Sequence, residues 1–378
     1  MSNRKLDETI PIAPLKIIAL DSCKEFSQIV DRYVVDVRRA RNSQYYDSSS
    51  YLVNYSLPRF GTGEAKAVIH ETLRGSDLYI IADVMNDSNE YTMFSDTTFK
   101  SPDDHFQDLK RVIAAAKISR VKRINVILPF LYESRQHKRY KLESLDSALA
   151  LQELSQMGVE NIITFDAHDP RVQNAIPIRG FDNFYTSLQF IRELLRTEEN
   201  IQFDSKHLMV ISPDEGGMSR AVYYANVLGV EMGMFYKRRD YSTMIDGRNP
   251  IVDHEFLGSN VEGKDVFVID DIISSGDSVL DIAVELKQRK ARRIFIAATF
   301  GLFCNGLDRM DKAYEDGFID RIYTTNLIHT PKELLTRPYY KNVDLSKYVA
   351  LIIDTLNHDT SINDIINPVT LIHELIHR

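Results

Sequence analysis

The chain is 378 residues long, with 44% hydrophobic and 26% charged residues, which allows two globular domains of ordinary size. Its net charge of -8 argues against a general nucleic-acid-binding protein, which would usually be basic. No apolar run has the length of a membrane span or signal peptide, and the cysteines, Cys23 and Cys304, provide neither a disulfide framework nor a zinc-ligand spacing, so we expect a cytoplasmic protein without a membrane partner.

Apolar runs and one amphipathic pattern predict the elements of the first 120 residues. Strands are expected at residues 15–20 and 78–82, and a helix at 105–117. The serine-rich segment 38–50 is expected to be a loop. Residues 86–104, rich in Asn, Asp, Ser and Thr, are expected to form a surface insertion.

A strand–loop–helix–strand pattern then occurs twice, which predicts parallel βαβ units and two similar α/β domains. We place the domains at residues 1–185 and 186–354, with a linker near 180–187. The C-terminal helix, residues 355–378, is expected to pack on the first domain. The predicted elements of the repeat and of the segment between its copies are strands at 124–128, 161–165, 207–211, 266–269 and 293–299 and helices at 145–157, 219–228 and 279–290.

The most informative stretch is DVFVIDDIISSGDS, residues 265–278, which reads as a buried strand, a short loop and the start of a helix. Asp270 and Asp271, expected at the strand's carboxyl end, suit ribose hydroxyls or a divalent cation. The hydroxyls and amides of the following loop suit a phosphate at a helix N-terminus. The alternative is an ordinary strand-to-helix turn with a capping serine.

Two further motifs suit a metal ion. His168 in FDAHD follows a predicted strand and can coordinate Mg²⁺ or orient a phosphate, although a structural histidine is the alternative. Asp214 in SPDEGG can hold a metal beside two glycines that let a ligand approach the backbone, and a plain turn explains that segment equally well.

Two basic motifs suit phosphates. SRQHKRYK, residues 134–141, has five cationic or imidazole side chains and suits a polyphosphate, with a solvated basic loop as the alternative. In YKRRD, residues 236–240, Lys237 and Arg239 are alternate residues of an extended segment and are expected to aim two cations at one transferring phosphoryl group. No Walker-type GxxxxGK[ST], GxGxxG or Ser-His-Asp elbow is present, so a kinase of the usual folds is unsupported.

Taken in chain order, these motifs resemble those of the ribose-phosphate pyrophosphokinase family over roughly residues 15 to 368. The resemblance implies an α/β fold of two tandem type I phosphoribosyltransferase-like domains, with parallel sheets flanked by helices. It implies transfer of the diphosphate of ATP to C1 of ribose 5-phosphate, giving phosphoribosyl pyrophosphate and AMP, with Mg²⁺ as cofactor. It also implies a homo-oligomer, from dimer to hexamer, whose sites are completed across subunits, and no nucleic-acid partner.

The resemblance further implies a role for each motif. The residues similar to the family's ATP-binding positions are Phe60 and Glu64 of RFGTGE together with Arg135, Gln136 and His137. Those similar to its catalytic positions are Lys237, Arg239 and His168, and those associated with the metal are His168 and Asp214. Those similar to its ribose-phosphate-binding positions are Asp270, Asp271, Ser274, Ser275, Gly276, Asp277 and Ser278.

The chain departs from the family pattern at several of these positions. His137 and Thr62 each replace an aspartate, and Ser274 and Asp277 change the phosphate loop, where an added carboxylate would repel a phosphate unless a cation relieves it. Two alternatives therefore stay open, namely the same chemistry on another ribosyl acceptor and a non-catalytic regulatory paralogue. A phosphoribosyltransferase that consumes the diphosphate would explain neither the duplicated domain nor SRQHK.

Overall fold

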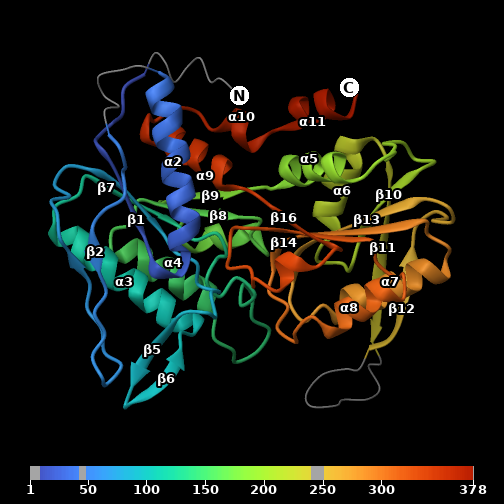
Figure 1. Ribbon diagram of the computed structural model, residues 1–378, viewed down its shortest axis with the longest axis horizontal. Coiled ribbons are helices and arrows are strands. Elements are labelled where there is room, and N and C mark those ends of the chain that lie inside the picture. Colours follow the sequence, from blue (N-terminus) through green and yellow to red (C-terminus); the bar gives the residue numbers. More distant parts are fainter. Residues whose placement is uncertain (1–8, 42–47, 240–250, 378) are drawn as a thin grey trace. The chain divides into compact units, whose positions relative to one another are not determined.

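A computed structural model describes residues 9–41, 48–239 and 251–377 (Figure 1). The chain divides into two compact units, and each is described by itself. Unit 1 comprises Met1–Tyr185, Asn326–His329 and Asp344–Ile366. Unit 2 comprises Thr186–Thr325, Thr330–Val343 and Asn367–Arg378.

Unit 1 is built on a five-stranded parallel sheet with the order β1-β4-β7-β8-β9. Its central strands are apolar runs buried on both faces, as parallel sheets require, so the strands expected in this part of the chain are confirmed. The strands are β1 (Leu15–Ala19), β4 (Asp77–Ile81), β7 (Arg123–Ile127), β8 (Asn161–Phe165) and β9 (Gly180–Phe184). The two units meet along the chain at Tyr185 and Thr186, inside the expected linker near 180–187. Residues 180–184 of that segment are not a linker, because they form β9, an edge strand that pairs with β8 and whose polar GFDNF sequence hides its strand character.

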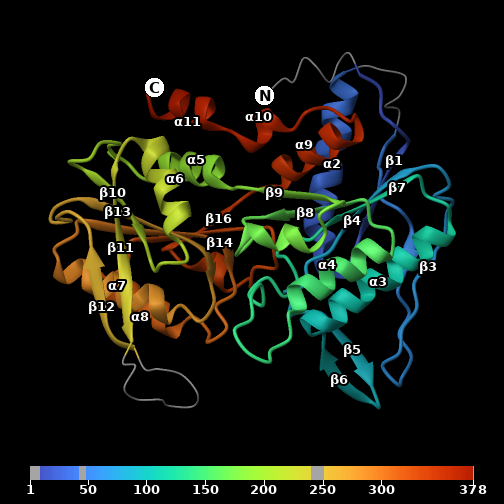
Figure 2. The same cartoon turned by 180° about the vertical axis from the view of Figure 1, so that it is seen from behind.

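Helices cover both faces of this sheet, with α3 and α4 on one face and α2 and α9 on the other (Figures 1 and 2). They are α2 (Lys24–Ala40), α3 (Pro102–Ile118), α4 (Asp146–Gln156), α9 (Ser346–Asn357) and α10 (Asn363–Ile366), with short 3-10 turns η1 (Asp21–Cys23) and η2 (Pro170–Ala175). The loop expected from residue 38 begins later, because Arg38 is a buried residue of α2 that pairs with Asp354 of α9 at 2.6 Å.

Within the expected insertion at 86–104, residues 90–99 form a hairpin rather than an irregular loop, and residues 102–104 already belong to α3. Strand β5 (Glu90–Met93) pairs antiparallel with β6 (Asp96–Phe99) through the two-residue turn Phe94–Ser95. The Tyr, Thr and Phe residues in both strands have β propensity, which the polar composition masked. A second small pair, β2 (Tyr55–Ser56) and β3 (Val68–Ile69), flanks the turn that contains RFGTGE.

Unit 2 contains a seven-stranded sheet with the order β12-β11-β10-β13-β14-β15-β16, parallel except for β12, which pairs antiparallel with β11. The strands are β10 (Leu208–Ser212), β11 (Glu231–Arg239), β12 (Ile251–Leu257), β13 (Asp265–Ile273), β14 (Arg293–Gly301), β15 (Arg321–Thr325) and β16 (Tyr340–Val343). The helices are α5 (Ser187–Thr197), α6 (Met218–Leu228), α7 (Asp277–Gln288), α8 (Asp308–Glu315) and α11 (Val369–Ile376), with the 3-10 turn η3 (Leu334–Thr336). The α/β class expected from the repeat is confirmed.

The tail differs from the expectation in two respects. Helix α9, whose residues 346–354 were assigned to the second domain, belongs to unit 1, and α11 belongs to unit 2. Helix α11 packs on α6, where His373 Nε2 lies 3.1 Å from the carbonyl oxygen of Val227. The apolar face of α11 therefore completes unit 2, and only the part of the tail up to Ile366 packs on unit 1.

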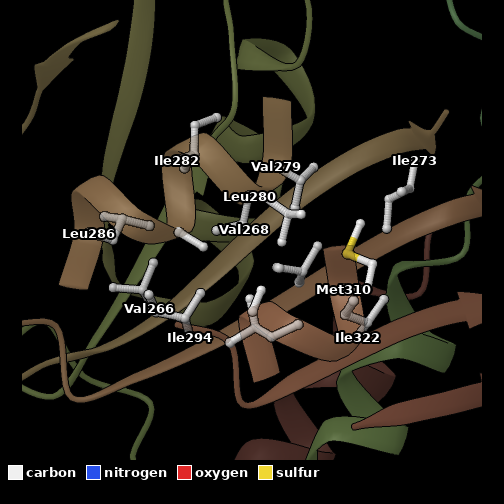
Figure 3. Packing of buried hydrophobic residues seen from close by; sticks show 14 of the residues in the cluster. Val266, Val268, Ile273, Val279, Leu280, Ile282, Leu286, Ile294, Met310 and Ile322 are labelled. Carbon is white, nitrogen blue, oxygen red and sulfur yellow. The ribbon is translucent and has the colours of Figure 1, made fainter. Parts of the chain in front are cut away.

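The core of unit 2 includes buried residues both of strand β13 and of helix α7, the two elements on either side of the loop at residues 274–276. Val279, Ile282 and Leu286 of α7 pack toward Val268 of β13 and Ile294 of β14 (Figure 3). Full burial of each such side chain stabilises the fold by about 1.5–3 kcal/mol. The loop between β13 and α7 therefore has a fixed position at each of its ends, because both elements are packed in the core. Within the described residues, no helix combines the length and apolar character needed to cross a bilayer.

Candidate functional site

In unit 1, RFGTGE forms a tight exposed turn. Phe60 N–H donates to Glu64 O at 2.7 Å, and Gly63 N–H donates to Phe60 O at 2.8 Å. The Phe60 ring is 52% exposed, and the exposed Glu64 carboxylate accepts a hydrogen bond of 3.0 Å from Thr62 Oγ1. The turn therefore presents an aromatic face and a carboxylate, which can stack on a planar base and accept from its amino group.

The segments that follow β7 and β8 come together because these strands are parallel neighbours. The His137 and His168 rings lie 5.1 Å apart between centroids, and His137 Nε2 lies 3.6 Å from Asp169 Oδ2. Burial and the neighbouring His168 lower the pKa of His137, which favours the neutral form of its ring. The structure therefore joins the SRQHK and FDAHD motifs into one cluster, a pairing that the sequence alone did not predict.

Asp169 holds this cluster in place. Its carboxylate binds the Arg171 guanidinium, with Nε at 2.9 Å from Oδ1, and caps the turn η2 through Arg171 N–H at 2.9 Å. The hydrogen bonds from Arg171 lower the pKa of Asp169 to about 2. Arg135 and Gln136, which precede His137 in the chain, and His168, which precedes Asp169, are exposed, so this edge of the sheet can receive a polyanion.

In unit 2, Asp270 and Asp271 lie inside β13 rather than beyond it. The ladder between β13 and β10 ends at Val268, so both carboxylates still lie at the carboxyl edge of the sheet on that side. Arg220 Nη1 of α6 lies 4.0 Å from Asp270 Oδ1 and 3.8 Å from Asp271 Oδ1. Burial and the neighbouring Asp271 raise the pKa of Asp270 well above its usual value, although Arg220 opposes this. Such a pair can both accept from and donate to ribose hydroxyls.

The loop after β13 is closed by contacts that the sequence did not reveal. Gly276 has φ +89°, and a Cβ there would lie 2.0 Å from Met310 Cε, so the position requires glycine. Asp277 accepts from Ser275 Oγ at 3.0 Å and forms an ion pair with Arg309 of α8. Arg309 is thus the cation that compensates the extra carboxylate of this loop.

The remaining loop residues lie around the same turn. Ser274 O accepts from Cys304 N–H at 2.9 Å, and Ser274 Oγ lies 3.9 Å from Cys304 Sγ. Ser278 is an exposed residue of the first turn of α7. The hydroxyl groups predicted for a phosphate are therefore gathered at one helix N-terminus.

Asp214 follows β10, the strand next to β13, and therefore reaches the same edge of the sheet. Its Oδ1 accepts from Gly216 N–H at 2.9 Å and Gly217 N–H at 3.2 Å, which fixes the carboxylate in the turn. Among the described residues, His, Cys, Asp and Glu form no group of three that could hold an ion on their own. A site that uses one or two carboxylates and completes its coordination with water and substrate phosphates suits this arrangement and Mg²⁺.

Arg220 and Arg309 were missed in the sequence. Arg220 is the third residue of α6, the helix after SPDEGG, and Arg309 is the second residue of α8. Neither arginine belongs to a recognised motif, so its distance along the chain from such a motif is the one feature of the sequence that could have pointed to it. Lys237 and Arg239 belong to β11 and pair with His254 and Ile251 of β12. The predicted orientation of these two side chains lies outside the described residues.

Comparisons with known proteins cover both units. Residues 15–158 match the family model described as the N-terminal domain of ribose phosphate pyrophosphokinase, and residues 181–335 match that of the phosphoribosyl transferase domain. A curated ribose-phosphate pyrophosphokinase from Vibrio parahaemolyticus is 27% identical over 316 residues, covering 82% of this chain and 90% of that protein. One from Helicobacter hepaticus is 28% identical over 312 residues, with the same two shares of 82% and 90%.

One solved structure shares the fold over most of the chain. The phosphoribosylpyrophosphate synthetase from Mycobacterium smegmatis aligns with a TM-score of 0.74 and 19% identity, covering 91% of this chain and 99% of that one.

Proposed function

The chain belongs to the ribose-phosphate pyrophosphokinase family, and we propose on that basis that it transfers the diphosphate of ATP to C1 of ribose 5-phosphate. The observation that carries the proposal is that each unit presents its own ligand-binding surface. Unit 1 has an exposed turn and a basic histidine cluster suited to a nucleotide, and unit 2 has a carboxylate pair followed by a hydroxyl-rich helix N-terminus suited to a sugar phosphate.

In unit 1, Phe60 stacks on the adenine and Glu64 accepts from its amino group. Arg135 and Gln136 donate to the phosphates, and the His137 ring offers a further hydrogen-bond donor to them. The chain has Thr62 where the family has an adenine-contacting aspartate, so base selection rests mainly on Phe60 and Glu64.

In unit 2, Asp270 and Asp271 hold the ribose hydroxyls, and Ser274, Ser275, Gly276 and Ser278 bind the 5-phosphate. The O1 hydroxyl attacks the β-phosphorus and loses its proton, a new O–P bond forms, and the bond from the β-phosphorus to the oxygen bridging it to the α-phosphate breaks. Phosphoribosyl pyrophosphate and AMP leave. Positioning and charge stabilisation dominate such a transfer, because no covalent enzyme intermediate is required.

Mg²⁺ is the proposed cofactor, and His168 of unit 1 and Asp214 of unit 2 are candidate ligands, each considered within its own unit. When bound, the ion neutralises charge on the ATP phosphates. Asp214 suits this role because one carboxylate oxygen is fixed by two backbone N–H groups.

Lys237 and Arg239 are the proposed catalytic cations. Replacing Lys237 by alanine should lower kcat by orders of magnitude, because a charge that stabilises only the transition state is lost. Arg238→Ala, the intervening position, is the matched control and should leave kcat nearly unchanged, since successive residues of a strand face opposite sides.

The decisive experiment incubates the purified protein with ATP, Mg²⁺ and ribose 5-phosphate and measures AMP and phosphoribosyl pyrophosphate. We expect the two products in equal amounts, and an absence of AMP would reject the proposal. Light scattering on the same sample tests the proposed homo-oligomer.

A second acceptor class is motivated by Ser274 and Asp277, the positions at which the phosphate loop departs from the family pattern. Another ribosyl compound with less negative charge near this loop would avoid the carboxylate. A panel of acceptors, read by AMP release, separates the two, because a clear preference for ribose 5-phosphate excludes the alternative.

A further inference from the structure

The β5–β6 hairpin contacts the exposed turn of residues 60–64. We infer that this hairpin braces the turn in its ligand-binding conformation, and that Arg59, Tyr91 and Met93 are positioning residues for nucleotide binding. The inference rests on the proposed function, since the turn carries Phe60 and Glu64.

The tip of the hairpin touches the turn directly. Phe94 N–H donates to Gly61 O at 2.8 Å. A Cβ added to Gly63 would lie 2.8 Å from Met93 Sδ and 3.9 Å from Tyr91 Cε2, so the hairpin approaches the turn as closely as a glycine allows. Gly63 also has φ +90°, so both the turn and its packing require this residue.

Arg59 joins the hairpin to the turn from the other side. Its guanidinium lies 4.2 Å from the centroid of the Tyr91 ring, and Nη1 donates to Gly63 O at 3.0 Å. The Arg59 side chain is only 9% exposed, so its stacking on Tyr91 is shielded from water and correspondingly stronger.

Asp108 of α3 fixes Arg59 and the base of the hairpin together. Both of its carboxylate oxygens lie 3.1 Å from Arg59 Nη2, Lys100 Nζ lies 2.9 Å from Oδ2, and Arg111 Nη1 lies 2.6 Å from Oδ1. Burial alone would raise the pKa of Asp108, but Lys100 and Arg59 hold it below its usual value. The carboxylate therefore stays ionised and ties the turn, the hairpin and α3 at one point.

This brace has a direct consequence for binding. A turn with two glycines samples many conformations when unsupported, and ordering it on ligand binding lowers affinity. Contacts from the hairpin and Arg59 order the turn before the ligand arrives. The hairpin thus contributes to nucleotide affinity without touching the nucleotide.

The hairpin can be removed cleanly. Lys100 N–H donates to Asn89 O at 2.8 Å, so the ends of the excised segment already meet, and two glycines in place of residues 90–99 close a β-turn there. Tyr91→Ala is a second variant that keeps the hairpin. Phe99→Ala, at an exposed position of β6, is the matched control.

Two measurements on the full-length variants test the brace. Hydrogen exchange of the free protein reports order in residues 59–64, and calorimetric titration with ATP reports affinity. We expect exchange there to become roughly tenfold faster and ATP to bind roughly tenfold more weakly in the excision variant, with a smaller effect for Tyr91→Ala. The KM for ribose 5-phosphate should stay unchanged, and Phe99→Ala should match the wild type.

The outcomes separate the brace from the proposed function. Unchanged exchange in residues 59–64 would overturn the brace, as would faster exchange with unchanged ATP affinity. If the wild type binds no ATP, the proposed function fails, while the exchange rates still decide whether the hairpin orders the turn. A changed mass in light scattering together with unchanged exchange would assign the hairpin, with its exposed Phe94 and Phe99, to a subunit interface instead.

Discussion

Replacing Arg309 by alanine should weaken the binding of ribose 5-phosphate. Arg309 and Asp277 form an ion pair whose side chains are 59% and 41% exposed, so a ligand can reach both. In the proposed site the acceptor phosphate binds at the same helix N-terminus. Without Arg309, the Asp277 carboxylate faces a phosphate dianion with no compensating charge.

The magnitude follows from Coulomb's law. A carboxylate about 5 Å from one phosphate charge is repelled by about 0.8 kcal/mol in a water-like dielectric, which suits an exposed pair, and a dianion doubles this. The KM for ribose 5-phosphate should therefore rise roughly tenfold to twentyfold at low salt, with kcat nearly unchanged. Raising the salt from about 50 mM to about 300 mM should shrink the effect, because exposed charges are screened.

The chain offers a matched control on the same helix. Lys312→Ala removes one positive charge from α8, where Lys312 pairs with Asp316 at 3.0 Å, and should leave this KM unchanged. Adding Asp277→Asn to Arg309→Ala should restore the wild-type KM, because the unpaired carboxylate is gone. Equal KM values for Arg309→Ala and Lys312→Ala, or no recovery in the double variant, would refute the reasoning.

Three further changes test the glycine of the loop, the pairing of α2 with α9, and a buried carboxyl group. Gly276→Ala should raise the KM for ribose 5-phosphate and lower the free energy of unfolding by about 1–3 kcal/mol, while Gly263→Ala, also at positive φ but in open space, should leave the KM unchanged. Asp354→Ala leaves buried Arg38 without its carboxylate and should lower the free energy of unfolding by about 3–5 kcal/mol in urea titrations, whereas the exposed Asp359→Ala should change it little. Burial raises the pKa of Asp83 from 3.8 to about 7, so the folded state binds the extra proton and this group's contribution to stability falls as pH rises across that window. The difference in unfolding free energy between wild type and Asp83→Asn should fall from pH 5 to pH 8, and a constant or rising difference would contradict this.

Most of the sheet framework could be predicted because buried parallel strands have a local signature. Runs such as the one before Asp270 are apolar at every position, and the strand–helix repeat fixes their parallel sense. In that framework, motifs that follow neighbouring parallel strands lie at the same edge of the sheet, as Asp214 and Asp270 do. Much of the candidate site could therefore be predicted from the sequence. Strand β9 and the β5–β6 hairpin were missed because edge strands and hairpins of polar residues lack this signature.

The sequence by itself determined the α/β class, the duplicated strand–helix pattern and the motifs that mark the family, since these depend on spacing along the chain. Only the tertiary structure decided which charges meet. Arg309 reaches Asp277, Arg220 approaches Asp270 and Asp271, and Arg59 joins the turn to the hairpin through Asp108. Each of these pairs links segments far apart in the sequence, and a surface arginine has no local pattern that names its partner. The loop of residues 274–278 gives the clearest example. Its added carboxylate, Asp277, can be read from the sequence, whereas the compensating cation, Arg309, is identified only by the packing of α8 beside α7.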